Sequence, residues 1–105
     1  MTPRDHLIES FKAALSAADP ELIVPLHLPA PPANGRTLVV GAGKAAAAMA
    51  RAVDRAWPVN APLSGTVICR YAHGFSVDES PKRITVVEAG HPVPDANGEA
   101  AAADI

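Results

Sequence analysis

The sequence predicts an α/β fold, in which an N-terminal helix is followed by a Rossmann-like, mostly parallel βαβ sheet. Short apolar runs rich in β-branched residues, "TLVVG", "GTVICRY" and "ITVVEAG", are typical of buried strands. An alanine-rich stretch with helical spacing, residues 44–57, separates the first two runs. This alternation of strand and helix is the pattern of a parallel sheet, and the first crossover is expected to be right-handed.

The N-terminal third is predicted to be helical and then extended. Thr2 can cap a helix over residues 3–18, which should present one apolar stripe. Asp19 can cap a second short helical turn in "DPELIV", and the proline-rich "LPAPPANG" is typical of a connector. We therefore divide the chain into a helical segment with its connector, 1–35, and the first portion of a Rossmann-like α/β domain, 36–105.

The elements of the α/β part follow in order. Strands are expected over 37–40, 65–71 and 84–90, and "HPVPDANG" should form a rigid turn into a last helix. One side of the helix 44–57 is expected to carry Ala45, Ala48, Met49, Ala52, Val53 and Ala56. The charged residues Arg51, Asp54 and Arg55 are expected elsewhere on its surface.

The composition excludes several classes of protein. With a net charge of −2 and no basic stripe, the chain is not predicted to bind nucleic acid or an anionic membrane. Its N-terminus lacks the apolar region of a secretory signal and its single cysteine, Cys69, excludes an internal disulfide, which favours a cytoplasmic location. Its four histidines lack zinc-site spacing, so no metal ligand is assigned.

The chain is also expected to be an incomplete part of a larger, two-domain protein. Aromatic residues make up only 4% of it, and the many alanines bury little area each, so its core should be thin. The final "NGEAAAADI" reads as a helix without a closing signal. The oligomeric state is left open, with a homo-oligomer among the options.

The stretch "GAGKAA" fits the dinucleotide fingerprint G-x-G-x-x-A. Gly41 would permit a tight turn, and Gly43 would let the backbone approach a phosphate. An NAD enzyme would need an acidic residue near the end of the second strand, but that strand ends close to Arg70, which suits the 2′-phosphate of NADP instead. A P-loop is excluded because Leu38 and Ala45 stand where a glycine and a hydroxyl are required.

Lys44 is the most informative residue of this stretch. A helix N-terminus carries about half a positive charge, so a cation there costs roughly 0.3–1 kcal/mol unless an anion is bound. Lys44 is either a solvated surface lysine or one that shares an anion with the helix amides, and a carboxylate or a phosphoryl group suits that field.

The segment "EAGHPVPDANGEA" is either a stiff connector or part of a site. In the second interpretation His91 and Asp95 lie beside Lys44, because the carboxyl ends of parallel strands share one edge of the sheet. For Arg70 in "RYAHG" we favour a salt bridge or solvation over anion binding, and for Cys69 a place in the core over a role as nucleophile.

The combination of "VVGAGKAAAAMA" with "VVEAGHPVPDANGEAAA" resembles the N-terminal portion of the MOFRL-type glycerate 2-kinases, some of which carry the name hydroxypyruvate reductase. The resemblance implies a full-length enzyme that uses ATP and Mg²⁺ to phosphorylate D-glycerate, with nucleotide and substrate between two domains. It also implies that this piece alone is inactive.

The same resemblance assigns roles to residues. Lys44 matches the family's catalytic lysine, and Gly41 and Gly43 match its glycines. His91 and Asp95 belong to its signature turn. The resemblance therefore implies that these five residues bind the substrate or a phosphate group. The chain has "RYAHG" where the family often has Tyr-Gly, so His73 receives no role. Two alternatives remain: an NADPH-dependent hydroxypyruvate reductase, and an α/β module without catalytic function.

Overall fold

The computed structural model describes residues 1–105 and confirms the α/β fold. Its three strands are all parallel, in the order β1-β2-β3. The elements are α1 (Pro3–Ala17), α2 (Pro20–Ile23), the 3₁₀ helix η1 (Val24–His27), β1 (Thr37–Ala42), α3 (Ala46–Ala56), β2 (Leu63–Arg70), β3 (Thr85–Ala89) and α4 (Ala96–Asp104).

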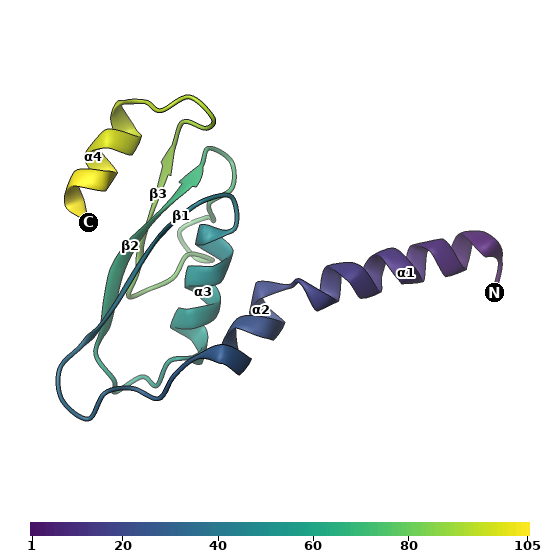
Figure 1. Ribbon diagram of the computed structural model, residues 1–105, viewed down its shortest axis with the longest axis horizontal. Coiled ribbons are helices and arrows are strands. Elements are labelled where there is room, and N and C mark those ends of the chain that lie inside the picture. The colour runs from purple at the N-terminus through teal and green to yellow at the C-terminus, as the bar shows by residue number, and fades with distance from the viewer.

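Helices cover both faces of the sheet. α3 lies on one face, and α4 lies on the other, against β3 and β2 (Figure 1). The loop 71–84 joins β2 to β3 on the α3 face, where the Lys82 amide donates to the carboxylate of Asp54. Both crossovers, from β1 to β2 and from β2 to β3, therefore use the same face of the sheet.

The sheet requires a glycine at one position. Gly65 of β2 has φ +151°, in the region that favours glycine, and pairs with Val39 of β1. A Cβ at residue 65 would collide with the carbonyl oxygen of Val39. The close approach of β1 and β2 thus depends on a missing side chain.

The core is as thin as the composition predicts. Only 13 of the 105 residues are buried, and most of them are small. The central cluster consists of Ala46, Ala50, Trp57, Leu63, Val67 and Ile84. Cys69 is also buried, in agreement with its predicted place in the core.

The predicted inward side of the α3 helix is wrong in part. Ala52 is buried and Val53 packs against the core, as the spacing predicts. Met49 is 49% exposed, whereas Ala46 and Ala50 contact the sheet. Asp54, expected on the surface, is buried because the loop 71–84 folds back over the helix. Arg83 from this loop donates to the Asp54 carboxylate with an Nε–Oδ1 distance of 2.8 Å, so a long-range ion pair decides which side of the helix is covered.

α1 projects away from the sheet (Figure 1). Thr2 caps it as predicted and forms a capping box with Asp5. Its apolar stripe, however, packs against nothing, and no residue of α1 is buried. Neither α1 nor any other helix is both long and apolar enough to cross a membrane.

Candidate functional site

The carboxyl ends of β1 and β2 and the turn after β3 meet around a small pocket of about 140 Å³. Its lining comes from three separate parts of the sequence, as the parallel sheet requires. The lining residues are Ala42, Gly43, Lys44, Ile68, Cys69, Arg70, Gly90 and His91. The structure therefore brings together Gly43, Lys44 and His91 from the predicted site.

Lys44 occupies a turn and not the first turn of a helix. Gly43 has φ +141°, so the chain cannot be helical there, and α3 begins only at Ala46. The predicted helix start at residue 44 is therefore wrong by two residues. Lys44 is exposed and forms no salt bridge within the chain, and no side chain caps α3, so its ammonium group is available for a ligand.

Arg70 also lines the small pocket. It is the last residue of β2, it is exposed, and its guanidinium has no carboxylate partner in the chain, so of the two expected outcomes, a salt bridge or solvation, the structure shows solvation. Its position at the end of a parallel strand was the available signal. His91 follows Gly90 at the end of the neighbouring strand and is also exposed.

The electrostatic character of the pocket follows from this lining. Lys44 and Arg70 are cationic, His91 adds an imidazole ring, and none of the lining residues is acidic. The Gly43 amide donates to the Ile68 carbonyl and the Gly90 amide bonds to Asp95, so the positive character of the pocket comes from its side chains. The arrangement suits a carboxylate or a phosphate group, whose negative charge these side chains can balance.

Asp95 is not part of the pocket lining. Its carboxylate accepts a hydrogen bond from the Tyr71 hydroxyl at 2.6 Å and another from the Gly98 amide at 3.0 Å, and it caps α4. The hydrogen bond from Tyr71 contributes most to lowering the pKa of Asp95, and hydrogen bonds from the backbone amides of Gly90 and Gly98 lower it further. Its oxygens are thus used to hold the turn that carries His91, which is a positioning role.

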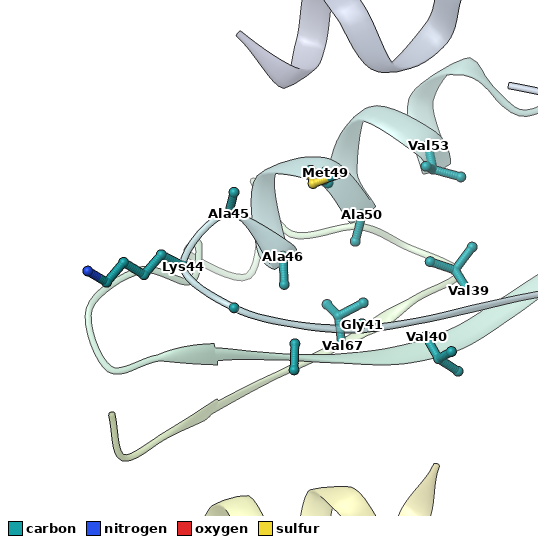
Figure 2. A pocket seen from close by; sticks show the side chains of 12 residues that line it. Val39, Val40, Gly41, Lys44, Ala45, Ala46, Met49, Ala50, Val53 and Val67 are labelled. Carbon is teal, nitrogen blue, oxygen red and sulfur yellow. The ribbon is translucent and has the colours of Figure 1, made fainter. Parts of the chain in front are cut away.

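Gly41 also lies outside the small pocket. It belongs to β1, and a Cβ there would lie 3.7 Å from Val67 Cγ1, an ordinary contact. It lines a larger apolar groove of about 510 Å³ between β1 and α3 (Figure 2). Lys44 stands at one end of this groove, and its side chain points away from the apolar residues.

The chain contains no cluster of three or more histidine, cysteine, aspartate or glutamate side chains that could hold a metal ion. The small pocket in particular offers cationic side chains and no carboxylate, whereas Mg²⁺ prefers oxygen ligands. The residues at this edge therefore fit the phosphates of a nucleotide but do not fit the Mg²⁺ that accompanies it.

The fold and the pocket together define a Rossmann-like α/β domain with a cationic pocket at the ligand-binding edge of its sheet. The family model described as "Domain of unknown function (DUF4147)" matches residues 6–105, and the chain belongs to this family. The resemblance to the MOFRL-type glycerate 2-kinases, whose N-terminal domain this family represents, is thereby confirmed.

Curated relatives agree with this assignment. Two proteins of Agrobacterium vitis, both named "Putative hydroxypyruvate reductase", are 50% identical over 95 residues and 51% identical over 61 residues. A protein of Pyrococcus horikoshii named "Glycerate 2-kinase" is 41% identical over 62 residues. These matches cover 90%, 58% and 59% of this chain, but only 20%, 14% and 12% of the relatives. No solved structure matches the chain.

Proposed function

We propose that this chain forms the anion-binding N-terminal part of an ATP-dependent glycerate 2-kinase, which transfers the γ-phosphoryl group of ATP to the 2-hydroxyl of D-glycerate. The observation that carries the proposal is the pocket lined by Lys44, Arg70 and His91, which has no acidic residue in its lining. The family membership and the name of the Pyrococcus horikoshii relative support it.

The proposed reaction requires positively charged groups of the kind that line this pocket. Phosphoryl transfer depends mainly on positioning and on neutralising the charge of the transferred group. Lys44 would balance the charge of the phosphoryl group or of the glycerate carboxylate as a compact, mobile ammonium. Arg70 can bind two oxygens of one anionic group at once, which would fix its orientation.

Mg²⁺ has no assigned residues in this proposal. The pocket does not provide the oxygen ligands that this ion needs. The chain's own contribution is to bind and orient the anionic group. Asp95 supports this indirectly, since it holds the turn that presents His91.

The test uses a hybrid protein, because the chain spans only 20% of the first Agrobacterium vitis relative. In the hybrid, this chain replaces the matched segment of that relative. We expect ATP-dependent phosphorylation of D-glycerate, and Lys44→Ala should lower kcat by about 10²–10³-fold because it removes charge stabilisation in the transition state.

Lys12→Ala is the matched control. Lys12 is an exposed lysine of α1 that pairs only with Glu9, so its loss should leave the rate unchanged. Full turnover by the Lys44→Ala hybrid would contradict the assigned role of Lys44.

The second candidate is an NADPH-dependent hydroxypyruvate reductase. Arg70 stands at the end of β2, where an arginine can hold the 2′-phosphate of NADP, and the names of the two Agrobacterium vitis relatives point the same way. The same hybrid separates the candidates: oxidation of NADPH by hydroxypyruvate, without phosphorylation of glycerate, would favour the reductase.

A further inference from the structure

Tyr71 is the first residue after β2, and it bonds to both ends of the turn 90–95 that follows β3. Its backbone amide donates to the carbonyl oxygen of Ala89, the last residue of β3, at 3.2 Å. Its hydroxyl donates to the carboxylate of Asp95, the N-cap of α4, at 2.6 Å. One residue therefore contacts this turn where it begins and where it ends.

The turn 90–95 closes around the Asp95 carboxylate. The Gly90 amide bonds to this carboxylate from one side of the turn, and the Gly98 amide donates to it at 3.0 Å from α4. A Cβ at residue 90 would lie 2.6 Å from the carbonyl oxygen of Val93, so the turn leaves no room for a side chain there. His91 therefore lies in a compact turn whose place depends on Asp95.

The Tyr71 hydroxyl is itself held in place by a second partner. The side-chain amide of Asn97, in the first turn of α4, donates to the hydroxyl oxygen at 2.9 Å. Tyr71 is 47% exposed and does not belong to the core cluster. Hydrogen bonds, and not burial, therefore determine where the hydroxyl points.

The hydroxyl keeps its proton at neutral pH. The hydrogen bond to Asp95 contributes most to raising the pKa of Tyr71, and burial and the negative charges of Asp95 and Glu88 raise it further. The hydrogen bond from Asn97 lowers this pKa but is outweighed. Because the pKa of Asp95 is lowered, a neutral hydroxyl faces a carboxylate, and the hydrogen bond between them is charge-assisted.

The contact joins two sides of the small cationic pocket. Arg70 lines the pocket and directly precedes Tyr71, and His91 lines it from the turn 90–95. Within the loop 71–84, Tyr71 is the only residue whose side chain forms a hydrogen bond with this turn or with α4. The relative placement of the two lining side chains therefore depends on its hydroxyl.

We propose that Tyr71 is a positioning residue of the anion pocket. Through Asp95, its hydroxyl fixes the turn 90–95 and so holds His91 in a set place relative to Arg70. This role rests on the anion-binding function proposed above. A pocket whose side chains are already in place binds an anion more tightly, because less ordering is required on binding.

Tyr71→Phe removes only the hydroxyl and tests the proposal on the isolated chain. Without ligand, amide hydrogen exchange at Gly90 and Gly98 should become at least about tenfold faster, since the Asp95 carboxylate loses its hydroxyl donor. Inorganic pyrophosphate, titrated while amide chemical shifts are followed, should bind about three- to tenfold more weakly.

Asp54→Asn is the matched control for a general loss of stability. It removes a carboxylate contact at the other end of the loop 71–84, far along the chain from Tyr71. It should lower the stability of the chain and leave the affinity for pyrophosphate unchanged. A loss of affinity in Tyr71→Phe alone therefore reports positioning.

The route through Asp95 is tested by a double variant. Asparagine also caps helices, so Asp95→Asn retains the cap of α4 but weakens the contact with Tyr71. The effects of Tyr71→Phe and Asp95→Asn on pyrophosphate affinity should not add, because both break the same hydrogen bond. Fully additive effects would contradict this route. Asn97→Ala, which removes the donor to the hydroxyl, should weaken the binding in the same direction but less.

Unchanged exchange at Gly90 and Gly98 in Tyr71→Phe would overturn the proposal. Faster exchange with unchanged pyrophosphate affinity would also overturn it, because the hydroxyl would then serve the turn and not the pocket. If the wild-type chain binds no pyrophosphate, the proposed anion-binding function fails, and the exchange rates alone decide whether Tyr71 holds the turn.

Discussion

At the scale of single residues, the buried carboxylate of Asp54 links α3 to the loop 71–84. It accepts hydrogen bonds from the Lys82 amide at 2.9 Å and from Arg83 Nε at 2.8 Å. Arg83 also donates to the carbonyl oxygens of Pro58 and Trp57 at the end of the helix. One arginine thus satisfies both a buried charge and the free carbonyls of a helix C-terminus.

This arrangement predicts how stability depends on pH. Burial raises the pKa of Asp54, but the hydrogen bonds from the Lys82 amide and Arg83 outweigh it and hold the pKa below its ordinary value. Its contribution to stability is therefore complete above the unfolded-state pKa, about 3.9, and is lost as the pH falls through the lower, folded-state pKa.

Urea denaturation between pH 2 and pH 7 measures the effect. Asp54→Asn should lower the free energy of unfolding at neutral pH by about 1–3 kcal/mol, since Arg83 loses its charged partner. The substitution should also make the decrease in the free energy of unfolding at acidic pH less steep. Asp78→Asn, at an exposed position of the same loop, is the control. Acid profiles of equal steepness for the wild type and Asp54→Asn would contradict this role.

At the scale of elements, the pairing of β1 with β2 depends on Gly65. Gly65→Ala places a methyl group against the carbonyl of Val39 at a residue with φ +151°, so both backbone strain and collision oppose it. We expect a loss of more than about 3 kcal/mol in the free energy of unfolding.

Gly35→Ala separates the two causes. Gly35 has φ +94°, but no atom lies within 4 Å of the position that a Cβ would take, so the substitution should cost only the backbone strain, about 1–2 kcal/mol. Thermal unfolding of both variants, followed by circular dichroism, makes the comparison. Equal losses for Gly35→Ala and Gly65→Ala would show that the close contact with Val39 is unimportant.

The order of elements was predictable because it depends on local patterns. The β-branched runs predicted three strands, and Thr2 with Pro3 predicted the start of α1. The inward side of α3 was predictable only in part, at Ala52 and Val53, because an alanine-rich helix has apolar residues on several sides. The contact between Asp54 and the distant loop 71–84 determines which of these sides is covered.

The same distinction holds for the site. The convergence of Lys44 and His91 followed from the rule that parallel strands end at one edge of the sheet. The roles of Arg70 and Asp95 depend on partners brought by folding: no carboxylate reaches Arg70, whereas Tyr71 and the first turn of α4 occupy the oxygens of Asp95. The strand end signals the place of Arg70, but sequence spacing contains no signal for the hydrogen bond between Tyr71 and Asp95.

At the scale of the whole molecule, the chain is an α/β unit with a thin core, a projecting helix and a cationic edge. α1 buries none of its residues, and β1 leaves both its faces partly uncovered. The pocket at the carboxyl edge is nevertheless formed within the chain, because all three segments that line it belong to the parallel sheet and its turns. Anion binding can therefore be tested on the isolated chain, even though catalysis is proposed only for a longer protein.

The most direct test of the cationic pocket is a titration of the isolated chain with inorganic pyrophosphate, followed by amide chemical shifts in nuclear magnetic resonance spectra. Saturable shifts should centre on Gly43, Lys44, Gly90 and His91, and Arg70→Ala should weaken the binding by about tenfold, since it removes a charge-assisted contact. Shifts that are absent from these amides, or that gather around Arg4 and Lys12 of the exposed helix α1, would contradict the account.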